Sequence, residues 1–374
     1  MRPGVRESGV YAPTVMDGVG AGTFGKPLLV ELSHVIEQFA LGLEPATPTV
    51  VIALFQKLAY FSREAEVYRE IAARGAVTVV GLAEEVPPEL PPGVRHVLIA
   101  PADDLEREWS VTVLTPGGGA TLVASDLEKL DPVGATLESA RTFRAGWSFR
   151  REEARTQVLR LRTKLRLDGV TATGIDAVLD AVAVRSEPVQ ESAWDRSLHF
   201  LTGRMDDAIR TRAAAAATVA AMEDGHDRDP HTGFTGPTSL ERWLAGSAAG
   251  TLPVGLVLLR LPGLAALRPR YGRRGELAVL QGLATALRER TGVCDRVVAL
   301  GPEEVLLVLP SAAPDDVLEL CHEVCRHAAT IGESYPFVAL PALVAGTVTR
   351  ERPLPLDRLR RNVAPVREVA LVPG

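Results

Sequence analysis

The strongest constraint on the fold is a pattern that occurs twice, in which short apolar runs alternate with amphipathic helical segments. In the first half, runs rich in β-branched residues at 49–56 and 77–83 predict buried strands, and residues 62–75 between them have helical spacing. The pattern returns after residue 250, whereas residues 150–222 carry almost no strand signal. Strands that alternate with helices favour α/β domains, in which helices cover a sheet. We therefore expect an α/β (α+β) chain with two such domains and a helical region between them.

This pattern divides the chain into five expected regions. They are a flexible N-terminal segment at 1–27, a mixed-sheet domain at 28–165, a helical linker at 166–225, a βαββαβ domain at 226–350 and a C-terminal tail at 351–374. The glycine-rich residues 20–27 match the spacing of two phosphate-binding loops. However, no buried strand precedes them, and Pro27 stands where a Mg²⁺-binding hydroxyl is needed. A flexible lead-in is therefore the better interpretation of this segment.

Apolar residues recur in the linker with gaps that alternate between four and three, which is the spacing of a two-helix seam. The seam positions are Trp194, Leu198, Leu201, Met205, Ala208, Arg212, Ala215, Val219 and Met222. Arg212 interrupts this seam, and its alanines weaken it. Two interpretations stay open. The helix lies on its own domain, or it forms a coiled coil with a second copy of the chain and makes a homodimer.

Charge and cysteine content exclude several classes of protein. The chain has 41 basic and 47 acidic residues, a net charge of −6, whereas a general nucleic-acid binder needs a basic face. Cys294, Cys321 and Cys325 are too few for a disulfide framework, which fits a reducing compartment. No apolar run approaches the ~18 residues of a membrane-spanning helix. These features predict a cytoplasmic protein with no membrane span and no nucleic-acid partner.

Two short motifs mark the second domain. Residues 229–234 read DPHTGF, and the tip of a predicted hairpin reads Gly301, Pro302, Glu303, Glu304 and Val305. In their order and spacing, residues 226–350 resemble a GGDEF domain, the fold of diguanylate cyclases. The resemblance implies a βαββαβ domain that binds guanine nucleotides or cyclic dinucleotides. In an active member it also implies Mg²⁺ and conversion of GTP to cyclic di-GMP.

Several positions depart from the GGDEF pattern. Arg260 stands where the family has its first metal-binding aspartate, and a cation there repels a metal ion. Arg268 and Glu276 align with the guanine-reading asparagine and aspartate, while Asp295 keeps only the aspartate of the inhibitory product site. Pro302 replaces a glycine that lets the backbone approach the nucleotide. We therefore assign no catalytic residue, and Glu303 with Glu304 also fits an ordinary solvated turn.

The first domain carries a different set of landmarks. They are Phe55-Gln56, Tyr68-Arg69, and residues 108–111, 122–126 and 141–148. With these, residues 28–165 resemble a DICT domain, a sensory module found with diguanylate cyclases, and the resemblance implies that the domain senses a ligand or signal. The candidates for lining a ligand pocket, which are aromatic or basic, are Tyr60, Phe61, Arg63, Trp109, Arg141 and Trp147.

Two further groups of residues have metal-ligand chemistry. Cys321 and Cys325 share a helix face and have His322 and His327 beside them, but that face also carries the expected core stripe. Residues 226–231, HDRDPH, stand at a polar boundary where a turn is the simpler interpretation. We therefore expect no metal and no cofactor, with Mg²⁺ only if the second domain is an active cyclase.

Together the two resemblances predict a bacterial signalling protein. A DICT-like sensor would act through the helical linker on an inactive GGDEF-like module, which binds a nucleotide, a cyclic dinucleotide or an unidentified signalling protein. Two alternatives remain. One is an active diguanylate cyclase with a variant site, and the other is a scaffold in which neither domain binds a small molecule.

Overall fold

The computed structural model describes residues 21–101, 103–184, 191–334, 341–365 and 371–372. The expected flexible segment at 1–27 therefore lies mostly outside the described residues. The chain forms two compact units, which are considered separately below. The first holds the residues up to Leu127 together with Phe143–Asp206, and the second holds Glu128–Thr142 together with the residues from Asp207 onward.

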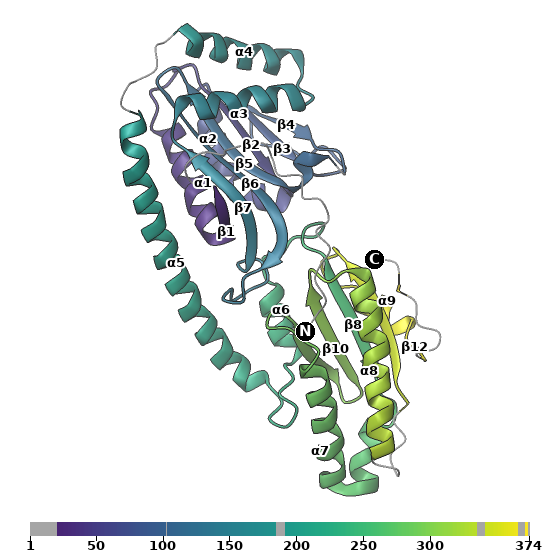
Figure 1. The fold of residues 1–374 in the computed structure, drawn as a ribbon. Helices are drawn as coiled ribbons and strands as arrows, with labels where there is room; N and C mark the ends of the chain where they lie inside the picture. Colours follow the sequence, from purple (N-terminus) through teal and green to yellow (C-terminus); the bar gives the residue numbers. More distant parts are fainter. Residues whose placement is uncertain (1–20, 102, 185–190, 335–340, 366–370, 373–374) are drawn as a thin grey trace. The chain divides into compact units, whose positions relative to one another are not determined.

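The first unit is built on a mixed sheet. Among the described residues its strand order is β1-β7-β6-β5-β2-β3-β4 (Figure 1). The strands are β1 (Gly22–Gly25), β2 (Val50–Phe55), β3 (Val77–Leu82), β4 (Val94–Leu98), β5 (Glu108–Thr115), β6 (Gly118–Leu130) and β7 (Arg141–Ser148). Strand β2 pairs in parallel with β3 and antiparallel with β5. The sheet is therefore mixed, as the sequence predicts.

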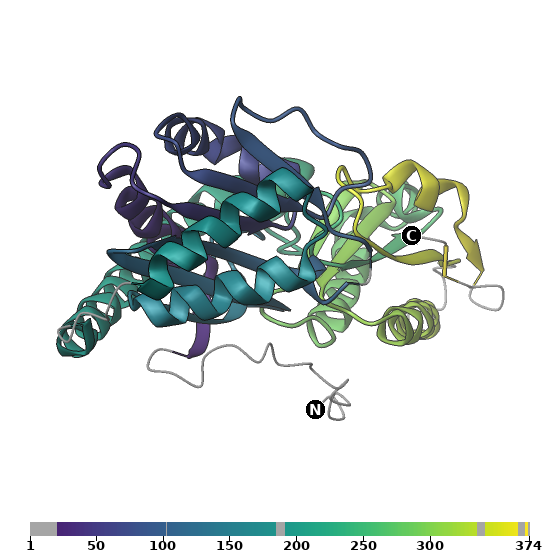
Figure 2. The same ribbon diagram turned by 90° about the horizontal axis from the view of Figure 1, so that it is seen from above.

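Helices cover both faces of this sheet (Figure 2). They are α1 (Lys26–Leu41), α2 (Leu58–Ala73), α3 (Arg151–Lys164) and α4 (Gly169–Val184), with the short η1 (Asp104–Arg107) before β5. Val50, Ile52 and Leu54 pack in one core with α3 and α4. Because strand side chains alternate between faces, Phe55 points to the other side, where its ring meets Phe61 of α2. The first unit is thus a three-layer α/β/α structure.

Two boundaries of the first unit differ from the sequence expectation. Residues 22–25 form β1, which pairs with β7 at the sheet edge, where a flexible lead-in was expected. Helix α4 was assigned to the linker, but Ile175, Val178 and Val182 are buried against the sheet. These three residues recur with gaps of three and four, which puts them on one helix face. That stripe makes α4 part of this core.

The second unit contains a βαββαβ arrangement, as predicted. Its strands are β8 (Val254–Arg260), β9 (Arg296–Gly301), β10 (Glu304–Pro310), β11 (Leu343–Thr349) and β12 (Ala364–Pro365), in the order β12-β11-β8-β10-β9. Its helical elements are α6 (Pro237–Leu244), η2 (Leu264–Ala266), α7 (Leu267–Arg288), α8 (Pro314–Ser334) and α9 (Leu356–Arg361). The central strand β8 pairs antiparallel with both β10 and β11.

The two faces of this second sheet have separate cores. Val257 and Leu259 of β8 pack with α7 and α8, whereas Leu256 and Leu258 pack with α6 and α9. The second of these cores also contains Leu137, whose backbone N–H donates to the Trp243 carbonyl at 2.8 Å. Residues 128–142, which comprise the last residues of β6, the turn after it and the first residues of β7, are thus part of the second unit. This division differs from the sequence prediction of one continuous domain over 28–165.

One long helix, α5 (Glu191–Asp227), contributes to both units, which divide it after Asp206. Three residues of its apolar seam, Leu201, Val219 and Met222, are 61%, 55% and 67% accessible, whereas Leu198 and Met205 are half-buried. Trp194 lies among the helix residues whose side chains are not described. Among the described residues, no helix combines the length and apolar character needed to cross a membrane.

Candidate functional site: the hairpin tip of the second unit

The candidate site lies at the tip of the β9–β10 hairpin. Antiparallel pairing places Glu304, the first residue of β10, directly opposite Arg260, the last residue of β8. Such cross-strand neighbours lie close enough for their side chains to meet. The guanidinium of Arg260 donates to Oε1 of Glu304 from Nε at 3.1 Å and from a terminal nitrogen at 2.5 Å. The residue at the expected metal-aspartate position is thus an ion-pair partner of the hairpin glutamate.

A second arginine approaches the same carboxylate from the C-terminal tail. Arg360 of α9 donates from Nε to Oε2 of Glu304 at 3.1 Å, and its other nitrogen lies 3.4 Å from Asp357. Partial burial, the largest single influence, raises the pKa of Glu304. The hydrogen bonds and charges of Arg260 and Arg360 outweigh it, so the pKa of Glu304 lies below its ordinary value. Glu304 is therefore ionised and held through both oxygens.

Glu303 binds the turn that follows β8. Its Oε1 accepts the backbone N–H of Gly263 at 2.8 Å and that of Ala265 at 3.4 Å. Its own carbonyl accepts the N–H of Leu261 at 2.9 Å. Gly263 has a φ of +91°, a conformation that glycine adopts without steric cost. These bonds fix the hairpin tip against the β8–η2 turn.

The donor set at this tip does not fit a Mg²⁺ ion. Magnesium prefers an octahedron of oxygen ligands, usually one or two carboxylates with waters and phosphates. Here Glu304 is paired with Arg260 and Arg360, and Glu303 accepts backbone N–H groups. A cation placed there would sit against two guanidinium groups and meet their repulsion. The residues present favour a closed ion-pair cluster over a metal centre.

Arg268 and Glu276, the two residues expected at the guanine-reading positions, lie on α7 on either side of a kink. Nε of Arg268 is 4.0 Å from a carboxylate oxygen of Glu276, and Gly272 between them has a φ of +72°. The two side chains therefore pair with each other at long range. The Arg268 side chain is mostly exposed, whereas that of Glu276 is mostly covered.

Asp295 shapes the turn before β9. One of its carboxylate oxygens accepts the N–H of Gly292 at 2.6 Å. The nearby Arg290 donates to Glu323 of α8 at 3.0 Å. Asp295 therefore has a structural partner in its own turn, and Arg290 is engaged elsewhere.

The six pocket candidates of the sensory domain fall into different places. In the first unit Tyr60 lies under Lys26, whose Nζ is 3.9 Å from the ring centroid, and Arg63 lies 5.8 Å from the same ring. Lys26 is also 6.0 Å from the Trp109 ring. Tyr60 and Trp109 thus lie beside Lys26, and Arg63 lies beside the Tyr60 ring.

The other three candidates have different surroundings. Phe61 is 1% accessible and Trp147 is 6%, and the Trp147 ring packs edge-on against Phe24 at 4.9 Å. Arg141 belongs to the second unit, where it pairs with Glu138 at 3.0 Å. These residues serve packing and local pairing in the structure.

The remaining sequence motifs have ordinary structural roles where they are described. Cys321 and Cys325 lie in the α7–α8 core, and burial raises the pKa of their thiols to about 12 and about 11. Asp229 accepts the backbone N–H groups of His231 and Thr232 in a polar turn. The side chain of His226 is outside the described part.

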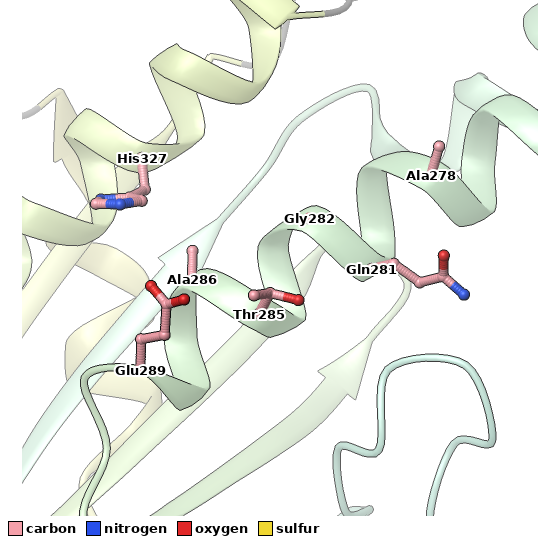
Figure 3. Close-up of a pocket in the computed structure, with 7 residues that line it drawn as sticks. All are labelled: Ala278, Gln281, Gly282, Thr285, Ala286, Glu289 and His327. Carbon is pink, nitrogen blue, oxygen red and sulfur yellow. The ribbon is translucent and has the colours of Figure 1, made fainter.

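An open pocket of about 500 Å³ lies along α7, opposite His327 of α8 (Figure 3). Its lining residues are Ala278, Gln281, Gly282, Thr285, Ala286, Glu289 and His327. Ala278, Gly282 and Ala286 recur every four residues, so small side chains line one face of the helix. The sequence offers this spacing as a signal, but small residues on a helix are too common to single out.

These observations define the class of protein by its fold. It has two α/β units, one a three-layer α/β/α structure with a mixed sheet and the other a βαββαβ structure. A family model described as a sensory domain in diguanylate cyclases and two-component systems, DICT, matches residues 17–127. The predicted DICT resemblance is thereby confirmed, with a match that begins earlier and ends before residue 165. No curated protein matches the chain.

Solved GGDEF structures resemble this chain at low identity. The GGDEF domain of DgcB from Caulobacter crescentus, in complex with c-di-GMP, has a TM-score of 0.31 and 13% identity, covering 36% of this chain and 86% of that one. The diguanylate cyclase SiaD from Pseudomonas aeruginosa, in complex with its activator SiaC, has a TM-score of 0.35 and 16% identity, covering 60% and 88%. The FimX GGDEF domain from Pseudomonas aeruginosa has a TM-score of 0.29 and 17% identity, covering 36% and 87%.

Proposed function

We propose that this chain is a cyclic di-GMP signalling protein whose first unit senses a signal and whose second unit is a non-catalytic binding module. The observation that carries the proposal is the pairing of Glu304 with both Arg260 and Arg360. Phosphoryl transfer depends on metal ions and positioned charge, with little covalent chemistry left for the protein. Glu304, the hairpin carboxylate that pairs with these two arginines, already neutralises this chain's own cations and is therefore not free to hold a metal ion.

The module's ligand is proposed from the same relatives. DgcB is described in complex with c-di-GMP, and SiaD in complex with an activator protein. A guanine nucleotide, a cyclic dinucleotide or a signalling protein is therefore the proposed partner class for the second unit. At the two positions that align with the family's guanine-reading residues, Arg268 is a cation and Glu276 keeps an acidic side chain.

We expect the full-length protein to form no cyclic di-GMP from GTP, with either Mg²⁺ or Mn²⁺, above a protein-free blank. The reason is the cationic residue at the expected metal position. Mass spectrometry of the products is the measurement. Product that forms with the natural chain and disappears in Glu304→Gln would establish an active cyclase and contradict the proposal.

Binding is tested separately from turnover. Isothermal titration of the full-length chain with GTP, GDP, cyclic di-GMP and cyclic di-AMP distinguishes a nucleotide receptor from a protein-binding module. Binding that weakens at least about tenfold in Arg268→Ala, a loss of ~1.4 kcal/mol, would place the ligand on α7. Binding of none of the four would leave a protein partner as the ligand class.

We also propose that α5 joins two copies of the chain. Leu201, Val219 and Met222 occupy seam positions and are more than half exposed, a pattern that a second helix would bury. Leu201→Glu is expected to weaken dimerisation at least about tenfold, because burying a leucine contributes ~1.5–3 kcal/mol. Sedimentation analysis over a concentration series measures the effect.

Phe200 offers the matched control for this variant. It is 66% exposed on the same helix but stands outside the seam. Phe200→Ser should leave the association unchanged. A chain that sediments as a monomer at all concentrations, or equal weakening by the two substitutions, would refute a dimer through this seam.

A further inference from the structure

Two helices of the first unit bring together three side chains with metal-ligand chemistry. His34 and Glu37 lie one turn apart on α1, and Glu64 lies on α2. One ligand atom from each of the three lies within 4.8 Å of the others, and His34 Nε2 is 3.4 Å from Glu64 Oε1. The group could not be predicted from the sequence, because Glu64 is far from the other two residues along the chain. Only the three-residue spacing of His34 and Glu37 can be seen there.

The cluster is closed at one end and open at the other. Glu37 is 2% accessible, whereas the side chains of His34 and Glu64 are 42% and 25% exposed. The hydroxyl of Tyr68, on α2, donates to Oε1 of Glu37 at 3.0 Å. A hydrogen bond of this kind orients a carboxylate ligand, and the exposed pair leaves a path for an ion to enter from solvent.

The buried carboxylate lacks a strong counter-charge. Within the part of the chain described, its electrostatic neighbours are Glu64, His34 and the Tyr68 hydroxyl, and no lysine or arginine pairs with it. Burial of a charge is costly unless the group is paired or coordinates a metal. A second carboxylate beside Glu37 adds to that cost, and a divalent cation between the two would offset it.

We propose that His34, Glu37 and Glu64 form a binding site for a divalent transition-metal ion of the Zn²⁺ class. One nitrogen and two carboxylate oxygens are ligands that zinc accepts in proteins. Two ligands at ~2.1 Å from a tetrahedral ion lie ~3.4 Å apart, which matches the distance between His34 and Glu64. Three protein ligands leave one position for water or an exchangeable ligand.

The site lies in the unit that the sensory family model matches, because residues 17–127 include all three ligands. The metal is thus either the signal that this unit detects or the anchor for one. The chemistry of the bound ion is the same in both roles. The proposal concerns the first unit alone, so it stands whether or not the second unit binds a nucleotide.

The test is metal retention by the full-length chain. Protein stripped with a chelator is loaded with Zn²⁺, freed of unbound metal on a desalting column, and analysed for metal by mass spectrometry. We expect the natural chain to keep one zinc ion, and His34→Ala and Glu64→Gln to bind it more than about tenfold more weakly, since each removes a ligand. Glu31→Gln, an exposed change on α1, is the matched control and should retain the ion.

Two further measurements keep the result decisive. Zinc should raise the unfolding temperature of the natural chain and of Glu31→Gln but not of the ligand variants, because an ion that binds only the folded state stabilises it. With Co²⁺, the absorption spectrum should lack a thiolate-to-cobalt band, which excludes Cys321 and Cys325 as the ligands.

Three outcomes would overturn the proposal. They are no retained zinc in the natural chain, equal retention in Glu64→Gln, and a thiolate band that accounts for all bound cobalt. If His34→Ala does not fold by circular dichroism, Glu64→Gln decides alone, since the partly exposed Glu64 is not required for packing.

Discussion

Replacing Phe61 by alanine is expected to lower the free energy of unfolding of the first unit by about 3–5 kcal/mol, the cost of emptying a packed aromatic position. Phe61 is 1% accessible, and its ring lies 5.5 Å from that of Phe55 and 5.6 Å from that of Tyr68. Each pair is edge-on, a geometry that aromatic rings favour. Chemical denaturation followed by circular dichroism measures the loss.

The neighbouring Tyr60 gives the control for this experiment. Its ring is partly exposed and contacts the Lys26 ammonium at 3.9 Å. Tyr60→Ala should cost about 1 kcal/mol or less, the value of an exposed cation–π contact. If Phe61→Ala costs no more than Tyr60→Ala, the phenylalanine does not belong to the core, and its assignment to a ligand pocket regains support.

The second large effect is expected at Glu304. Glu304→Gln should lower the stability of the second unit by about 1–3 kcal/mol, because charge-assisted hydrogen bonds from two arginines lose their anionic acceptor. The side chain is 17% exposed, so water replaces little of what is lost. Denaturant unfolding of the variant and of the natural chain gives the difference.

The same pairing fixes a pH dependence. The pKa of Glu304 lies below its ordinary value in the folded chain, so its contribution is fully present at neutral pH. It is lost as the pH falls from the ordinary glutamate pKa through the lower folded-state pKa. The difference in free energy of unfolding between the natural chain and Glu304→Gln should therefore become smaller as the pH falls.

Glu351 provides the comparison for Glu304. It pairs with Arg358 at 3.1 Å, with the two side chains 50% and 31% exposed. Glu351→Gln is expected to cost less than about 1 kcal/mol, as is usual for exposed pairs. Equal losses in the two variants would show that the hairpin cluster is an ordinary surface pair.

Much of the fold follows from hydrophobic periodicity. The runs at 49–56 and 77–83 become β2 and β3, because a buried strand is continuously apolar in sequence. The tail at 351–374 shows where prediction from periodicity fails. Its helix α9 is too short for a periodic signal, yet Leu359 is fully buried.

The candidate site could be predicted only in part. The hairpin residues Glu303 and Glu304 and the opposing Arg260 are recognisable because residues 226–350 resemble a GGDEF domain. Arg360 is not, since its approach to Glu304 depends on where a short tail helix folds back. The His34–Glu37–Glu64 group is hidden for the same reason, because helix packing brings its members together.

The hairpin end at residues 128–142 has a consequence for modularity. Its Leu137 is buried in the second unit's core, although the residues before and after the segment belong to the first unit. The polypeptide therefore passes between the units three times, at residues 127–128, 142–143 and 206–207. A hybrid made by fusing a foreign sensor at residue 207 would lack a piece of the output unit's interior. Exchange of these modules during evolution, or by an engineer, must carry residues 128–142 along with the C-terminal half.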